Sequence, residues 1–503
     1  MQKHGWKQSV FWRKDHDHSR NDPPSRASRP FFPNWQSLGA FVLPEWFPKA
    51  KFGVFIHWGL YSVPAFNNEW YSRNMYIKDH PEYDHHINTY GPQKNFGYKD
   101  FIPIFTAEKF DANEWIRLIK QAGANYLFPV AEHHDGFQMY KSELSEWNAA
   151  VMGPKKDILA ELKEAAEEQG LHFCTSSHRA EHWFFMGHGK EFDSDIKEPL
   201  EKGDFYWPAM PEPDNQDLYS EPYPSKEFLD DWLLRTCELV DNYQPELLYF
   251  DWWIQHEAFK EHLQVFAAYY YNRGAEWGKK VGICYKHDAM MFGSGIVEIE
   301  RGKFAEPQPF YWQTDTAIAR NSWCYTTTLD YKTTREILQD LIEVVSKNGN
   351  LLLNIGPKGN GSIPEKDQTI LKEIGAWLDV NGEAIYEAKP WRKAGEGPTT
   401  VVSGQFQEAQ ATTYTSQDFR FTVQGDSLYA IGMASPENGH ARIQALAQSK
   451  DQNLPEFHGI IQTVTILGHE EQPIDWQVTD EGLQLTFEPI ETDQPIVYKI
   501  TMK

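Results

Sequence analysis

The stretch Pro245-Glu246-Leu247-Leu248-Tyr249-Phe250-Asp251-Trp252-Trp253 predicts the fold class of this chain. Its four apolar residues, Leu247 to Phe250, form a run of the length expected for a fully buried strand. The run ends in a carboxylate set among aromatic side chains, and burying an unpaired carboxylate is costly. At the carboxyl end of a strand in an α/β barrel, such an Asp is typical of a catalytic residue. The alternative is an Asp251 that caps the following helix or pairs with an Arg.

Comparable strand-like runs alternate with helix-like segments over residues 36–392, which is the pattern of a parallel α/β fold. The predicted strands cover 52–57, 126–132, 172–176, 246–251, 281–285 and 351–355, with two more expected within 296–325. The predicted helices cover 112–122, 158–169, 226–242 and 334–346.

After Trp391 the apolar residues alternate with period two, which predicts an antiparallel β-sandwich over residues 393–503. Its predicted strands cover 399–402, 412–414, 419–423, 428–431, 460–467 and 483–487. Residues 1–35 are polar, and we expect them to form a leader outside the barrel.

The composition excludes several classes of partner. With 48 basic and 72 acidic residues the net charge is −24, which disfavours nucleic acid and anionic membrane surfaces. No apolar run approaches the roughly 20 residues of a membrane helix. Aromatic residues make up 15% of the chain, and aromatic rings pack well against the apolar faces of sugars.

The four scattered cysteines suggest reduced thiols, and no apolar signal segment is visible. These observations predict a cytoplasmic location, with a periplasmic or secreted one as the alternative. The sequence is also compatible with a homo-oligomer.

Polar and aromatic clusters follow the predicted strands at corresponding positions. His57 follows the first strand, and the long loop after it contains Glu69 and Trp70. His133 and His134 follow the second strand, and His178 follows the third. A single histidine at a strand end is more often structural than functional. Several such clusters around the mouth of one barrel predict a pocket for a small neutral ligand rich in hydroxyl groups.

A metal site is the competing interpretation of these histidines. His57, Glu132, His133, His134 and Asp135 could form a binuclear site like that of barrel amidohydrolases. However, no H-x-H motif follows the first strand, and no Lys is placed as a bridging carbamate. The sequence therefore predicts no metal and no cofactor.

A second carboxylate is available downstream of Asp251. Two carboxylates that flank a glycosidic bond suffice for its hydrolysis, and Glu298, Glu300 and Glu306 are the candidates for the partner of Asp251. Spacing alone does not choose among them.

Three segments carry a resemblance to a known family. The first segment covers residues 49–71 and includes Phe52-Gly53-Val54-Phe55-Ile56-His57-Trp58-Gly59 and Glu69-Trp70-Tyr71. The second is Glu132-His133-His134-Asp135-Gly136-Phe137, and the third is Asn348–Pro357 followed by Asn381–Tyr386. Over residues 40–395 the chain resembles the family 29 α-L-fucosidases. The resemblance implies a (β/α)8-like (TIM) barrel followed by a β-sandwich. It also implies retaining exo-hydrolysis of terminal α-L-fucosyl residues, with a fucosylated glycan as the substrate.

The resemblance also implies roles for individual residues. Asp251 matches the family's nucleophile, and Glu300 is preferred as the acid/base over Glu298 and Glu306. Tyr249 and Lys286 stand where many members have a Trp and an Arg. Thr175-Ser176-Ser177 stands in place of a Tyr-Tyr-Ser pattern, and His178 is expected to fill the role of that pattern. The complete set of expected substrate-binding residues is His57, Glu69, Trp70, His133, His134, His178, Tyr249, Lys286, Trp312 and Trp323.

Other functions remain open at this stage. One is a fucose-binding lectin with an inactive barrel, and another is hydrolysis of a related sugar such as an α-L-galactoside. We expect loops 77–100, 186–222 and 254–262 to select the leaving group.

Overall fold

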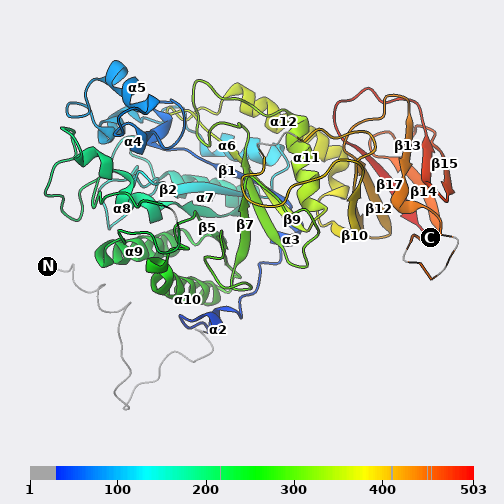
Figure 1. Cartoon of the computed structure of the whole chain (residues 1–503), viewed down its shortest axis with the longest axis horizontal. Helices are drawn as coiled ribbons and strands as arrows, with labels where there is room; N and C mark the ends of the chain where they lie inside the picture. The colour runs from blue at the N-terminus through cyan, green and yellow to red at the C-terminus, as the bar shows by residue number, and fades with distance from the viewer. Residues whose placement is uncertain (1–29, 216, 409–411, 450, 452, 455) are drawn as a thin grey trace, which may run out of the picture.

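Parallel strands close into a barrel in the first part of the chain (Figure 1). The computed structural model describes residues 30–215, 217–408, 412–449, 451, 453–454 and 456–503. Strand β1 pairs with both β2 and β9, which closes the sheet, and β3 and β4 together fill one of its eight positions. The predicted TIM-like barrel is therefore confirmed. The strands are β1 Phe52–Ile56, β2 Tyr126–Glu132, β3 His172–Phe173, β4 Thr175–Ser177, β5 Leu247–Phe250, β6 Gly282–Tyr285, β7 Ile296–Glu300, β8 Trp312–Ala317 and β9 Gly349–Ile355.

Helices cover the outside of the barrel (Figure 1). Several of them begin at a side chain that accepts a hydrogen bond from a backbone N–H of the first turn, the usual N-cap contact; examples are Asp111, Asp157 and Ser225. The long helices are α6 Ala112–Gln121, α7 Ile158–Gln169, α9 Lys226–Tyr243, α10 Lys260–Trp277, α11 Thr334–Val345 and α12 Glu365–Asn381. The other α-helices are α2 Trp35–Leu38, α3 Phe47–Ala50, α4 Tyr71–Asn74, α5 Pro81–Tyr90 and α8 His182–Phe185.

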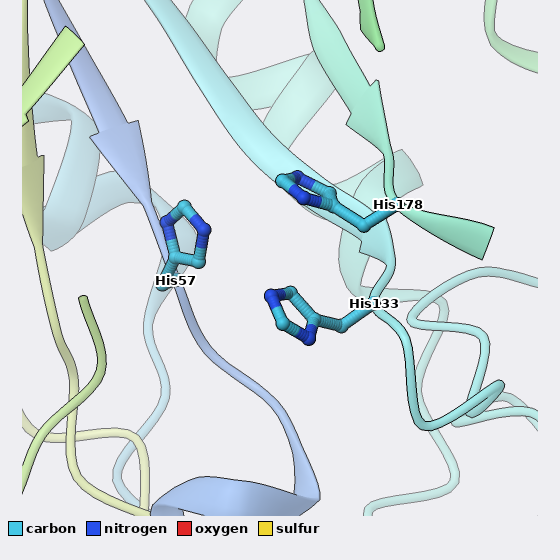
Figure 2. A group of neighbouring side chains, drawn as sticks. All are labelled: His57, His133 and His178. Atoms are coloured by element: carbon cyan, nitrogen blue, oxygen red, sulfur yellow. The ribbon is translucent and has the colours of Figure 1, made fainter. Parts of the chain in front are cut away.

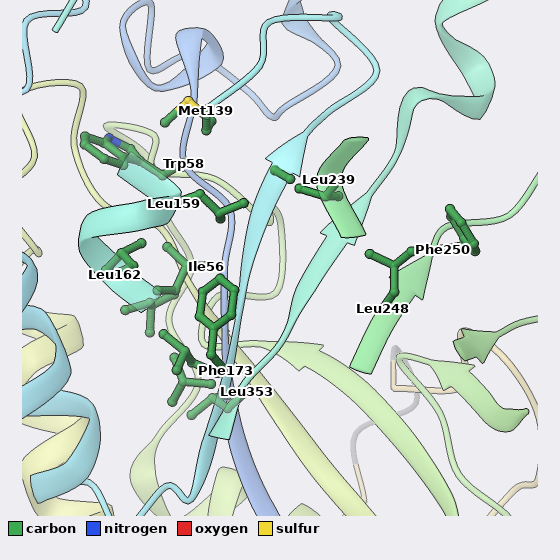
Figure 3. Close-up of a cluster of buried hydrophobic side chains, with 14 of the residues drawn as sticks. Ile56, Trp58, Met139, Leu159, Leu162, Phe173, Leu239, Leu248, Phe250 and Leu353 are labelled. Atoms are coloured by element: carbon green, nitrogen blue, oxygen red, sulfur yellow. The ribbon is translucent and has the colours of Figure 1, made fainter. Parts of the chain in front are cut away.

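Strands such as β1, β5 and β9 are largely apolar, as expected where both faces of a strand are buried. On the outer face, Ile56, Leu248 and Leu353 belong to the large core between strands and helices, as does Leu159 from α7 (Figure 3). On the inner face, Phe55, Phe128 and Tyr249 belong to a separate cluster with Cys284 and Leu352. Successive side chains of a strand point to opposite faces, so both cores draw on the same strands.

The segments after β6 and β7 depart from the regular β/α alternation. The described residues between β6 and β8 form loops and strand β7 with no α-helix. Strands β7 and β8 are the two that the sequence could not place, because polar residues such as Glu298, Glu300 and Asp315 interrupt their apolar pattern.

The C-terminal part forms two antiparallel sheets that enclose one core, which confirms the predicted β-sandwich. Residues 399–402 and the described residues 412–414 are not strands, which corrects the prediction. Thr399 instead donates both its backbone N–H and its hydroxyl to the Asp418 carboxylate. One sheet contains β10 Lys389–Glu396, β11 Phe419–Gln424, β12 Ser427–Gly432, β17 Ile496–Met502 and β14 Ile461–Ile466, and the other contains β13 His440–Ile443, β16 Gly482–Thr486 and β15 Asp475–Thr479.

The sandwich lies against α11 and α12 at one side of the barrel (Figure 1). Glu343 of α11 is buried and accepts hydrogen bonds from Arg420 of β11 and from Tyr414. Trp377 of α12 donates its indole N–H to the carbonyl of Pro495 at 2.9 Å. Both contacts join the two parts of the chain through buried polar groups.

Residues 1–29 of the expected leader lie outside the described residues. Among the described helices, none is both long and apolar enough to cross a membrane. All four cysteines are described, and they are buried free thiols.

Candidate active site

A pocket of about 210 Å³ opens at the carboxyl ends of the barrel strands. Strands β1, β2, β4, β5, β6, β7 and β8, or the residues that directly follow them, supply lining side chains, because parallel strands all end at the same face of the barrel. This size is below that of pockets for drug-sized ligands, about 300–1,000 Å³, and suits a ligand of monosaccharide size. The lining residues are His57, Glu69, Trp70, His133, His134, His178, Tyr249, Asp251, Trp252, Lys286, Glu300, Asp315, Trp323 and Phe406.

The structure brings together every predicted site residue except Trp312. Trp312 is the first residue of β8 and lies at the opposite end of the barrel from the pocket. Its indole is fully buried, packs edge-on against Phe304, and donates to the carbonyl of Lys347 at 2.9 Å. Trp312 is therefore a core residue, and its prediction as a substrate-binding residue is wrong.

Three residues that line the pocket were not predicted from the sequence. Asp315 lies in β8, three residues beyond Trp312, and its position in a polar strand was an available signal. Trp252 follows Asp251 directly. Phe406 comes from the segment between β10 and β11, far along the chain, and no sequence signal identified it.

Lys286 links the two carboxylates of the proposed chemistry. Its Nζ donates to Oδ1 of Asp251 at 3.0 Å and to Oε2 of Glu300 at 2.6 Å. Lys286 is almost fully buried, and its Nζ also lies 3.9 Å from Oδ2 of Asp315. Burial lowers the pKa of Lys286, but Asp251, Asp315 and Glu300 outweigh burial and raise the pKa well above its usual range. Lys286 is therefore a fixed cation between the two carboxylates.

The surroundings move the pKa values of Asp251 and Glu300 in opposite directions. Burial raises the pKa of Asp251, but Lys286, His178 and His134 together hold it well below the usual 3.8. Burial raises the pKa of Glu300 to about 7, and Lys286 only partly opposes that rise. Asp251 is therefore ionised and Glu300 holds a proton at mildly acidic pH. Two carboxyl groups with separated pKa values are suited to different roles.

The other candidate acids do not reach the pocket. Glu298 is two residues before Glu300 in β7, is buried in the barrel, and accepts from the Gln313 amide at 2.9 Å. Glu306 is exposed and does not line the pocket. Among the three glutamates considered from the sequence, only Glu300 therefore faces Asp251 across the pocket.

His57, His133, His134 and His178 line the pocket together. The rings of His57, His133 and His178 converge, with centroids 4.8 Å apart for His133 and His178 (Figure 2). Burial and the neighbouring histidines hold the pKa of His57 and His133 well below 6.5. Burial is also the main cause that lowers the pKa of His134 to about 3. Neutral imidazoles offer both a donor and an acceptor, which suits sugar hydroxyl groups.

Two groups of side chains that line the pocket have the spacing of metal ligands. These are His57 with His133 and His178, and His134 with His178 and Asp251, each with ligand atoms within 4.8 Å of one another. However, both ring nitrogens of His178 are already engaged, by Asp251 at 3.0 Å and by Ser176 at 2.9 Å. His57 Nδ1 is engaged by Asn354 at 2.6 Å. A metal bound through His178 would have to break one of these hydrogen bonds.

Glu69 and two tryptophans line the pocket beside the histidines. Glu69 accepts a hydrogen bond from the backbone N–H of Trp323 at 3.1 Å, and burial raises its pKa. The guanidinium of Arg301 lies 4.5 Å from the centre of the Trp323 ring, which orients that ring. Trp70 stands edge-on to His134. The pocket thus combines aromatic faces with hydrogen-bonding groups, as a site for a deoxy sugar requires.

Comparison with known proteins agrees with this geometry. The family model described as α-L-fucosidase matches residues 20–383, and the α-L-fucosidase C-terminal domain model matches residues 410–503. The chain belongs to the α-L-fucosidase family. It is therefore a glycoside hydrolase.

Individual relatives cover nearly the whole chain. Human plasma α-L-fucosidase is 33% identical over 479 residues, which is 90% of this chain and 87% of the relative. Human tissue α-L-fucosidase is 32% identical over 432 residues, which is 85% of this chain and 82% of the relative. The crystal structure of Thermotoga maritima α-fucosidase in complex with fucose has 29% identity and a TM-score of 0.70, covering 94% of this chain and 100% of that one.

Proposed function

We propose that this fucosidase removes terminal α-L-fucosyl residues from glycans with retention of configuration, through a covalent fucosyl–Asp251 intermediate. The observation that carries the proposal is the shared Lys286 contact. Lys286 Nζ lies 3.0 Å from Oδ1 of Asp251 and 2.6 Å from Oε2 of Glu300. The distance between these two carboxylate oxygens therefore cannot exceed the sum of the two contacts, about 5.6 Å. Retaining enzymes place their carboxyl groups about 5–5.5 Å apart, whereas inverting enzymes need about 6.5–9.5 Å to admit a water.

The two steps follow from the protonation states. In the first, a carboxylate oxygen of Asp251 attacks the anomeric carbon while the Glu300 carboxyl protonates the departing glycosidic oxygen. In the second, the Glu300 carboxylate takes a proton from water, the water oxygen attacks the anomeric carbon, and Asp251 is released. Lys286 stabilises the charge on both carboxylates during this exchange.

The remaining lining residues would hold the sugar. His57, His133 and Glu69 offer hydrogen bonds to the hydroxyl groups, and Trp70 and Trp323 offer apolar faces to the ring and its methyl group. A sugar with a hydroxymethyl group in place of the methyl, such as an L-galactoside, would bring a polar group against these rings. We therefore favour fucose over that alternative, and a panel of nitrophenyl glycosides separates the two.

Asp251→Gly tests the nucleophile. The variant should lose nearly all activity on nitrophenyl α-L-fucoside, and added azide should restore turnover with β-L-fucosyl azide as the product. Glu306→Gln, an exposed carboxylate outside the pocket, is the matched control and should keep its activity. Turnover by Asp251→Gly near that of the control would refute the assignment.

Glu300→Gln tests the acid/base separately. Its loss of rate should be larger for a fucosyl disaccharide than for nitrophenyl fucoside, because an activated leaving group needs little protonation. Azide should now give α-L-fucosyl azide, since Asp251 still forms the intermediate. Equal losses on the two substrates would point to another acid.

A further inference from the structure

A second cavity, of about 460 Å³, adjoins the catalytic pocket. The two cavities share the side chain of Phe406, which lines both of them. The other walls of the second cavity include Arg301 after β7, Arg320 after β8, and residues of α11 such as Asp340. The cavity therefore lies beside the end of strand β7 that carries Glu300.

The segment 404–408 is attached to the backbone of the proposed acid/base. The N–H of Phe406 donates to the carbonyl of Glu300 at 2.8 Å, and the Gln405 side-chain carbonyl accepts from the N–H of Glu300. Two further backbone bonds flank these contacts, from Gly404 to the carbonyl of Lys303 and from Glu408 to that of Arg301. These bonds fix Phe406 beside Glu300.

Phe406 is held in an unfavourable setting. Its side chain is 55% exposed, and its φ of 55° lies in the left-handed region that side chains other than glycine rarely adopt. Such a conformation persists only where surrounding contacts impose it, and it is common at binding sites. Because the ring stands at the junction of two cavities, it is available to a ligand that spans both.

The chemistry of the second cavity suits a neutral polyhydroxyl ligand. The carboxylate of Glu408 lies 3.0 Å from Lys332 Nζ and 3.4 Å from the Arg301 guanidinium. Lys303 Nζ donates to Asp340 at 2.6 Å. Each of these cations already has a counter-charge, so the wall presents fixed donors and acceptors of both signs. Hydroxyl groups can use both kinds of partner, whereas an anionic ligand would meet the carboxylates.

We propose that the second cavity binds a neutral oligosaccharide leaving group, with Phe406 as the surface on which its first sugar packs. The inference rests on the proposed function, because Glu300 protonates the leaving oxygen and so directs the leaving group to its own side of the pocket. The proposed site uses other residues than loops 77–100, 186–222 and 254–262, which the sequence led us to expect at the leaving group. None of the described residues of those loops lines either cavity.

The test compares two substrates that differ only in the leaving group. The leaving group of α-L-fucosyl fluoride is fluoride, which is too small to pack against the second cavity. The leaving group of a neutral fucosylated trisaccharide is a disaccharide, which extends into that cavity. Phe406→Ala should lower kcat/KM for the trisaccharide about three- to tenfold more than for the fluoride, the range expected for one aromatic packing contact. Phe406→Trp should restore most of this difference. Phe292→Ala removes another exposed phenylalanine, outside both cavities, and should leave the ratio unchanged.

A second measurement follows transfer of the fucosyl group to an acceptor sugar, which must enter the site that the leaving group vacates. With fucosyl fluoride as donor and a neutral disaccharide as acceptor, the wild type should form a transfer product, and Phe406→Ala should form less of it. Equal losses on both substrates, with unchanged transfer, would overturn the leaving-group site. Failure of the wild type to release fluoride would instead overturn the proposed function, so the two failures are distinguishable.

Discussion

Lys286→Met removes the cation that contacts both carboxylates of the site. In the wild type Lys286 Nζ lies 2.6 Å from Glu300 and 3.0 Å from Asp251, and Lys286 opposes the rise in the pKa of Glu300 that burial causes. Methionine keeps much of the side-chain volume and removes the charge. The substitution therefore isolates the electrostatic role of Lys286.

The size of the effect follows from these contacts. An opposite charge within about 4–6 Å lowers the pKa of a carboxyl group by about 1–3 units. Without Lys286, the pKa of Glu300 should rise from about 7 to roughly 8–10, which corresponds to about 1–4 kcal/mol. Because the acid form of Glu300 is the active one, the alkaline limb of kcat/KM should move upward by the same amount. The pKa of Asp251 also rises, but it starts well below 3.8, so Asp251 stays ionised near neutrality.

The rate itself should fall, because a preorganised charge of this kind contributes roughly 10²- to 10³-fold. The assay is the pH dependence of kcat/KM for nitrophenyl α-L-fucoside from about pH 4 to about pH 10, which reports ionisations of the free enzyme. Lys286→Arg keeps the charge and is the matched control. An alkaline limb that stays in place in Lys286→Met would refute the argument that Lys286 sets the pKa of Glu300.

Two further predictions concern metal dependence and stability. Dialysis against a chelator should leave activity unchanged, because His178 has both ring nitrogens engaged; loss of activity that zinc restores would contradict this. Arg420→Met should lower the free energy of unfolding in urea by about 1.5–3 kcal/mol, because the buried carboxylate of Glu343 loses a charge-assisted hydrogen bond while it keeps its ion pair with Lys347. Burial raises the pKa of Glu343, but Lys347 and Arg420 outweigh it and lower the pKa from 4.5 to about 2. The stability that this depressed pKa provides is therefore present above pH 4.5 and lost as the pH falls toward 2, and Arg420→Met should show a smaller acid-induced loss. An unfolding free energy equal to that of the wild type across this range would contradict the role given to Arg420.

The sequence alone determined the strands that are apolar on both faces and the residues that directly follow them. Leu247–Phe250 is readable as a buried strand because its apolar run is continuous, and Asp251 is placed by that strand alone. His133 and His134 follow β2 in the same way. Such information is local, since the end of a strand and the next residue lie at the same place in any parallel barrel.

Tertiary structure decided which distant residues face Asp251. Glu300 rather than Glu298 reaches the pocket, because it lies two residues further along β7, at the strand end. Trp312 and Asp315 belong to one strand, but three residues of strand separate them by roughly 10 Å, so only Asp315 lines the pocket. Phe406 reaches the site through backbone bonds to Glu300 from a segment beyond the barrel. Contacts of this kind depend on barrel closure and on the docking of distant segments, and no local pattern records them.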